Sequence, residues 1–294
     1  MTAIASIGPD IPHPLLAATG HYAGLLPWNV DRDFPLAAQW LESKFPLWAF
    51  SVMEDWASGA FDHLSAVVFS RGDDASQRLY YYLCELRRRG LVGGPEPLIM
   101  DVARIQRPGS EQRSIDAVRK LAARLGVDDA ALEQAIVAAN AAPAPTASAQ
   151  AGPRCLLAGT LPPDRRVHDA VAAAGWVPEG ETMDQAWSRP RAPVAEGTGD
   201  PCAALGRYVH DLKAGARSFH DRAGDMLARA AACGAAAAVL WYAEEDEAEV
   251  WNLPDQRRAL DGAGIPALVL TRRSWRFDDG ARDEIAAFLK ENAR

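Results

Sequence analysis

Cysteine is scarce in this chain of 294 residues, and the motifs that usually mark a catalytic centre are missing. The sequence contains no GxGxxG, no GxxxxGK(S/T) and no GxSxG pattern. Its six histidines show no metal-ligand spacing. The cysteines form no CxxC pair, which excludes a disulfide framework or a zinc site of the usual spacing. They are Cys84, Cys155, Cys202 and Cys233. No single motif therefore assigns a catalytic reaction.

Positive charge and long apolar runs are also lacking. Lys and Arg number 31 against 39 Asp and Glu, which gives a net charge of −8. This balance argues against a nucleic-acid partner or an anionic membrane, since both call for a basic face. No uncharged apolar run approaches about twenty residues, and the Ala-rich N-terminus lacks the basic region of a signal peptide. We therefore expect a soluble, cytoplasmic protein with no membrane partner.

The chain consists of alternating apolar runs, turns and helical stretches. An apolar run at 236–242 leads into the acidic turn 244–247, a helical stretch ending near Gly262, and a second apolar run at 265–270. A continuous apolar run is typical of a strand buried on both faces, so this stretch predicts a right-handed β-α-β unit. Residues 65–102 repeat the pattern, with Asp73 and Asp74 as the acidic turn. The stretches 3–28 and 155–177 also match, each giving strand, turn, helix and strand.

This repetition predicts two facing Rossmann/flavodoxin-like domains with mostly parallel sheets and one internally repeated plan. We assign residues 1–142 to an N-terminal α/β domain with trailing helices, 143–153 to a linker and 154–294 to a C-terminal α/β domain. The stretch APAPTASAQAGP contains only small residues, Pro and Gln, and cannot build a core. Expected strands include 3–7 and 25–28.

The two acidic turns supply the candidate catalytic residues Asp73, Asp74, Glu244 and Glu245. Open α/β sheets bind ligands at the carboxyl ends of their strands, so we expect both turns to line one interdomain cleft. Carboxylates there would act as an acid/base pair or hold a divalent cation. In the alternative interpretation they are solvated loops that cap the next helices.

Four further residues are candidates for ligand or cofactor binding at the same cleft. Two of them are glycines in strand-to-helix turns that resemble anion-binding loops, although neither turn has a complete phosphate motif. The other two are a serine in the aromatic region 34–61 and an arginine beside the first acidic turn. The four residues are Gly8, Ser51, Arg71 and Gly159.

Taken together, several stretches resemble the 2-hydroxyacyl-CoA dehydratase / benzoyl-CoA reductase subunit family, in the right order over nearly the whole chain. They are PDIPHPLLAATGHYAGLLPW, GAFDHLSAVVFSRGDDASQRLYYYL, LGVDDAALEQAIVAAN, RAGDMLARAAACGAAAAVLWYAEEDE and LDGAGIPALVL. The resemblance implies two facing α/β domains, an acyl-CoA ligand and a homologous partner subunit. It also implies a [4Fe–4S] cluster held by three cysteines.

The sequence departs from the family at the cluster. The three ligand places correspond to 46–51, 71–74 and 243–245, and none holds a cysteine; Asp73 takes the second place. Iron–sulfur clusters require thiolates, and carboxylates in their place disfavour an anionic cluster. We therefore expect no iron–sulfur cluster and no tightly bound cofactor. The resulting hypothesis is a divergent, cluster-lacking subunit that binds acyl-CoA or supports a cluster-bearing partner. The alternatives are a free-standing acyl-CoA or small-acid lyase that uses the interdomain carboxylates, and a non-catalytic binding protein.

Tryptophan is abundant, with nine residues in the chain. Trp187, Trp251 and Trp275 fall in stretches where burial is not evident, and large aromatic side chains are enriched at association surfaces. We therefore predict a homodimer or a heterodimer with a homologous subunit. The alternative is that all nine tryptophans line the two cores or the domain junction.

Overall fold

The computed structural model describes residues 3–103, 105, 107–143, 150–188, 190–212 and 220–293. These residues divide into two compact units. The first unit comprises Met1–Ala144 together with Trp187–Phe219, and the second comprises Pro145–Ala186 together with His220–Arg294. Each unit has its own sheet and its own hydrophobic core.

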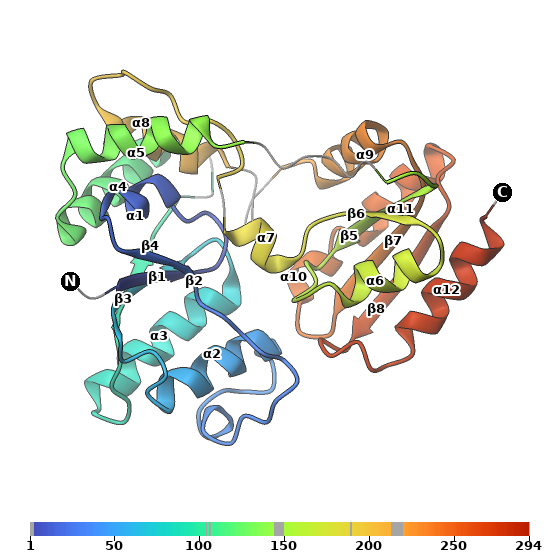
Figure 1. Cartoon of the computed structure of the whole chain (residues 1–294), viewed down its shortest axis with the longest axis horizontal. Coiled ribbons are helices and arrows are strands. Elements are labelled where there is room, and N and C mark those ends of the chain that lie inside the picture. The colour runs from blue at the N-terminus through green and yellow to red at the C-terminus, as the bar shows by residue number, and fades with distance from the viewer. Residues whose placement is uncertain are drawn as a thin grey trace. The chain divides into compact units, whose positions relative to one another are not determined.

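A four-stranded sheet forms the centre of the first unit (Figure 1). Its strands are all parallel and lie in the order β2-β1-β3-β4. They are β1 (Ala3–Ile7), β2 (Tyr22–Leu25), β3 (Leu64–Ser70) and β4 (Glu96–Met100). The helices of this unit are α1 (His13–Ala18), α2 (Leu47–Ala57), α3 (Asp74–Arg88), α4 (Ser110–Leu125), α5 (Asp129–Ala141) and α8 (Pro201–Asp211), with a short 3-10 helix, η1 (Ala37–Gln39).

Helices cover both faces of this first sheet. Helices α1, α4, α5 and α8 lie on one face, and α2 and α3 lie on the other (Figure 1). On the first face, Val68 of β3 belongs to one core cluster with Leu16 of α1 and Leu205 of α8. Helix α8 packs tightly on α4 because Gly206 has no side chain. A Cβ at that position would lie 2.5 Å from the Cα of Ile115.

The second unit has the same strand order, β6-β5-β7-β8, and is again all parallel. Its strands are β5 (Arg154–Gly159), β6 (Val177–Glu179), β7 (Ala235–Ala243) and β8 (Ala267–Arg273). Its helices are α6 (Arg166–Ala173), α9 (Arg222–Cys233), α10 (Glu247–Val250), α11 (Leu253–Gly262) and α12 (Ala281–Glu291), and α7 (Met183–Trp187) ends at its border.

The apolar run of β7 is buried on both faces, as its composition predicts. Helices α9 and α11 cover one face of the sheet, and α6 and α12 cover the other (Figure 1). Alternate residues of a strand point to opposite faces. Accordingly, Leu240 and Tyr242 share one core cluster with Met226 of α9 and Leu260 of α11.

The α/β class and the parallel sheets predicted from the sequence are confirmed. The strand expected at 25–28 lies instead at Tyr22–Leu25. The division of the chain also differs from the expected C-terminal domain at 154–294. Residues 187–219 group with the first unit, because α8 packs on α4 and α5. Residues 144–149 of the expected linker lie outside the described part of the chain.

The tryptophans singled out in the sequence differ in their burial. Trp187 and Trp275 are only 5% and 4% exposed, so neither is a surface side chain. Trp187 contacts the rings of Trp28 and Trp48 edge-on, at centroid distances of 5.9 and 5.3 Å. Trp251, between α10 and α11, is 83% exposed. It is the member of this group that remains a candidate for association.

No helix in the described part of the chain is long and apolar enough to cross a membrane.

Candidate functional site

The strand order of each unit marks where a ligand would bind. From β1 the chain crosses to β2 on one side and then to β3 on the other, so the topological switch point of the first sheet lies between β1 and β3. In the second sheet it lies between β5 and β7. Ligands of open α/β sheets bind outside the carboxyl ends of the strands at this point. The loops after these four strands carry most of the residues predicted from the sequence.

In the first unit, the loops after β1 and β3 touch through glycines. Gly8 has φ +99°, and a Cβ there would lie 2.8 Å from the Cβ of Ser70. A Cβ on Gly72 would lie 1.9 Å from Oδ2 of Asp10, so the carboxylate of Asp10 packs directly on that backbone. Asp10 itself is 8% exposed and adopts a left-handed φ of 62°. Close packing of Gly8 against Ser70 of β3 and Ser76 of α3 therefore accounts for this glycine without a ligand.

The acidic turn after β3 caps the following helix. The side chain of Asp73 accepts a hydrogen bond from the backbone N–H of Ser76 at 2.7 Å, and Asp74 occupies the first turn of α3. Beside them, the guanidinium of Arg71 pairs with Asp101, which also pairs with Arg113 at 3.1 Å. Although partial burial opposes it, the contact with these two arginines lowers the pKa of Asp101. This geometry matches the capping interpretation of the turn.

Ser51 lies inside α2 and is completely buried. Its hydroxyl accepts a hydrogen bond from the backbone N–H of Asn29 at 2.8 Å, and its carbonyl accepts one from Arg32 at 2.8 Å. These bonds hold the segment after β2 against α2. The described contacts of Ser51 are therefore structural.

The switch point of the second unit is built around Thr160 and Asp246. Thr160 directly follows β5, and its hydroxyl donates a hydrogen bond to Oδ2 of Asp246 at 2.7 Å. The same hydroxyl accepts one from the backbone N–H of Ala243, at the end of β7. Desolvation raises the pKa of Asp246. A threonine and a carboxyl group thus join the two loops where a ligand is expected.

Glu249 extends this group from helix α10. Its two carboxylate oxygens accept hydrogen bonds from Arg222, the first residue of α9, at 2.8 and 3.0 Å. The side chains of Glu249 and Arg222 are only 14% and 15% exposed. Burial raises the pKa of Glu249 to about 7, although the charge of Arg222 opposes the shift. A carboxyl group with this pKa can donate or accept a proton near neutral pH.

The predicted residues Glu244 and Glu245 lie next to this group but have different surroundings. Glu244 is exposed and pairs with Arg272 at 2.8 Å. Glu245 accepts a hydrogen bond from the indole N–H of Trp275 at 2.6 Å, and desolvation raises its pKa. Gly159 has a packing reason similar to that of Gly8, because a Cβ there would lie 2.3 Å from the carbonyl oxygen of Trp241.

The sequence therefore predicts a site at the turn after β7. It does not single out Asp246 and Glu249, whose pKa values burial raises. Asp246 stood in the acidic turn and could have been identified as a helix N-cap. Thr160 and Arg222 gave no signal, since they lie far from Glu249 in the sequence and meet it only through the fold. The predicted cleft shared by Asp73 and Glu244 concerns the placement of one unit against the other and stays a prediction.

The cysteines do not fit the iron–sulfur cluster that the family resemblance implies. Two lie in each unit, and all four lie within helices or at the start of a strand, away from the carboxyl ends of the strands. Burial raises the pKa of Cys155 to about 12 and also raises the pKa values of Cys84 and Cys202, which favours thiols over thiolates. Among the residues that the structure describes, no three His, Cys, Asp or Glu side chains are grouped to hold a metal.

A serine, a histidine and an aspartate also form a chain of contacts in the first unit. Ser110 Oγ lies 3.1 Å from Nε2 of His210, whose Nδ1 lies 2.9 Å from Asp211. This order of groups occurs in serine hydrolases. However, Ser110 is 8% exposed at the start of α4, and its hydroxyl also accepts a hydrogen bond from the backbone of Arg107. We interpret the chain of contacts as a link between α4 and α8.

Comparison with known proteins adds no assignment, because the sequence matches no family model and no curated protein. The family resemblance stated above therefore remains a hypothesis based on the sequence stretches themselves.

Proposed function

We propose that this chain is a non-redox subunit of a 2-hydroxyacyl-CoA dehydratase / benzoyl-CoA reductase-type system. In this role it binds an acyl-CoA or supports a cluster-bearing homologous subunit. The main support is the pair of all-parallel units with identical strand order, each with polar residues at its switch point. The second support is chemical, because burial raises the pKa values of Cys155, Cys84 and Cys202 and so favours thiols over the thiolates that a cluster requires.

Association with the partner is tested by sedimentation of the 31.7-kDa chain with and without a cluster-bearing homologue. We expect a complex, and we expect Trp251→Ser to weaken it, since exposed tryptophans often anchor interfaces. Tyr81→Ser is the matched control, because Tyr81 is also an exposed aromatic residue, at 56%, but lies in the first unit. A monomer at tens of micromolar in both experiments removes the partner-subunit function.

Iron analysis after anaerobic purification tests the non-redox part of the proposal. We expect neither iron nor acid-labile sulfide in stoichiometric amounts. Bound iron that is lost when Cys84, Cys155, Cys202 or Cys233 is replaced by Ser would contradict it.

The carboxyl groups of the second unit favour one alternative function, a free-standing lyase acting on an acyl-CoA or a small acid. The elimination of water needs a base for the carbon-bound proton and an acid for the leaving hydroxyl. Glu249 and Asp246 both have raised pKa values and lie at the switch point. The test follows enoyl thioester formation from hydroxyacyl-CoA substrates. Activity lost in Glu249→Gln but kept in Glu247→Gln supports the lyase, and no turnover in the wild-type chain excludes it.

A further inference from the structure

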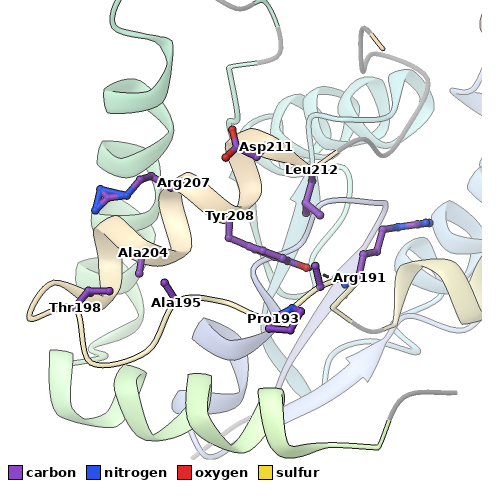
Figure 2. A pocket seen from close by; sticks show the side chains of 10 residues that line it. Arg191, Pro193, Ala195, Thr198, Ala204, Arg207, Tyr208, Asp211 and Leu212 are labelled. Carbon is purple, nitrogen blue, oxygen red and sulfur yellow. Dashed lines mark hydrogen bonds between the residues drawn. The ribbon is translucent and has the colours of Figure 1, made fainter. Parts of the chain in front are cut away.

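A pocket of about 530 Å³ lies beside α8 in the first unit. Helix α8 forms one wall, and the segment 191–198, which we call the strap, forms the other (Figure 2). The volume falls within the range of small-molecule sites, roughly 300–1,000 Å³.

Hydrogen bonds hold the strap in place. The side-chain amide of Asn140, on α5, donates to the carbonyl of Val194 at 2.7 Å and accepts from its N–H at 2.9 Å. The N–H of Gly197 donates to Glu133 at 2.7 Å. At the other end, the hydroxyl of Tyr208 accepts a hydrogen bond from the backbone N–H of Arg191 at 2.9 Å. Both walls are therefore fixed before any ligand enters.

The middle of the pocket is apolar and its ends are charged. Ala195, Pro193 and the ring of Tyr208 line the middle, and the hydroxyl of Tyr208 points toward Arg191 (Figure 2). Arg191 and Asp211 both line the pocket and carry opposite charges. The middle of the pocket therefore offers an apolar surface to a ligand that lies along the strap.

Arg207 and Thr198 also line the pocket (Figure 2), and among its charged residues the arginines Arg191 and Arg207 outnumber Asp211. Arg207 forms no salt bridge within the described part of the chain, although it lies close enough to Asp200 to interact with it electrostatically. Its acidic neighbour Asp200 is already engaged, because it pairs with Arg119 at 2.6 Å and caps α8 through the N–H of Ala203. The guanidinium of Arg207 can donate two parallel hydrogen bonds to a carboxylate, whereas the hydroxyl of Thr198 already donates to the carbonyl of Asp200 at 3.1 Å.

We propose that this pocket binds a small amphipathic carboxylate. The apolar body of the ligand lies against Ala195, Pro193 and Tyr208, and its carboxylate meets the guanidinium of Arg207. The argument uses only residues of the first unit and does not depend on the function proposed above.

Isothermal titration of the full-length chain with octanoate tests the proposal, with octan-1-ol as the uncharged probe. We expect Arg207→Gln to weaken octanoate binding about tenfold, because a charge-assisted contact is lost, and to leave octanol binding unchanged. Ala195→Phe should abolish binding of both probes by filling the pocket. Since Ala195 is exposed, this variant should fold normally, which its circular dichroism melting curve will show.

Arg258→Gln is the matched control, because Arg258 is an exposed arginine of the second unit whose loss should leave binding unchanged. Three results would overturn the proposal. They are no octanoate binding at millimolar concentration, equal binding by the folded Ala195→Phe variant, and equal loss of affinity in Arg207→Gln and Arg258→Gln.

Discussion

Replacing Glu249 with Gln should remove a defined part of the pH dependence of the second unit's stability. Burial raises the pKa of Glu249 from 4.5 to about 7. Above pH 4.5 the folded chain therefore binds more protons at this group than the unfolded chain does. Since stability falls with rising pH wherever the folded state binds more protons, the contribution of Glu249 is lost as the pH rises from 4.5 to 7. Gln cannot ionise and shows no such loss.

The size of the effect follows from the shift. A difference of 2.5 between the two pKa values of Glu249 corresponds to about 3 kcal/mol over the whole titration. Between pH 5 and pH 8 the wild-type chain should lose about 2.5 kcal/mol of unfolding free energy relative to Glu249→Gln. The other titrating groups are common to both proteins, so those that do not interact with Glu249 cancel in this difference.

Hydrogen exchange of the β7 amides is a suitable assay, because this strand lies at the centre of the second sheet and reports the opening of that unit. Urea unfolding followed by circular dichroism gives the same comparison for the whole chain. Glu247→Gln is the control, since Glu247 is an exposed residue of the same short helix. We expect the pH slope of this control to match that of the wild type.

Equal pH slopes for the wild type and Glu249→Gln would refute the reasoning. Such a result would mean that Glu249 is ionised throughout this range and that the charge of Arg222 outweighs burial. It would also remove the basis for acid/base chemistry at this switch point.

Three further substitutions follow from the contacts described. Gly159→Ala should lower the unfolding free energy by at least about 2 kcal/mol, because Gly159 has a positive φ and a Cβ there clashes with the Trp241 carbonyl. Gly175→Ala should lower it by about 1 kcal/mol, because Gly175 has a positive φ but open space around it. Thermal melting measures both effects. Asp73→Ala should cost about 1 kcal/mol through the lost cap of α3, and Asp73→Asn should restore most of it in urea unfolding. Burial lowers the pKa of His13 to about 4. As the pH falls from 6.5 to 4, the wild type should therefore lose about 3 kcal/mol of unfolding free energy relative to His13→Gln. Identical acid transitions would show that His13 titrates normally.

The strands and the acidic turns could be predicted because their signals are local. An apolar run such as VVF or VLWY identifies a strand buried on both faces, and the carboxylates after it identify the end where a ligand would bind. The β1 limits, Ala3–Ile7, were predicted correctly for the same reason. The strand predicted at 25–28 begins three residues after the start of β2, because the residues of β2 are half-buried or exposed and its sequence, YAGL, has little pattern.

Contacts between distant residues could not be predicted. The pairing of Arg222 with Glu249 and the bond from Thr160 to Asp246 depend on how α9 and the loop after β5 meet α10. The burial of Trp187 likewise depends on Trp28 and Trp48, far away in the sequence. Local composition carries no information on such pairs.

The assignment of α8 to the first unit has a consequence for co-translational folding. The chain enters the second unit after residue 144 and returns to the first at Trp187. Leu205 and Val209 of α8 belong to the same apolar cluster as Val68 and Leu16, so the first core is incomplete until α8 has emerged. By then β5 and β6 of the second unit have already been synthesised. The nascent N-terminal segment therefore exposes an apolar face during translation, and such a face invites chaperones or aggregation.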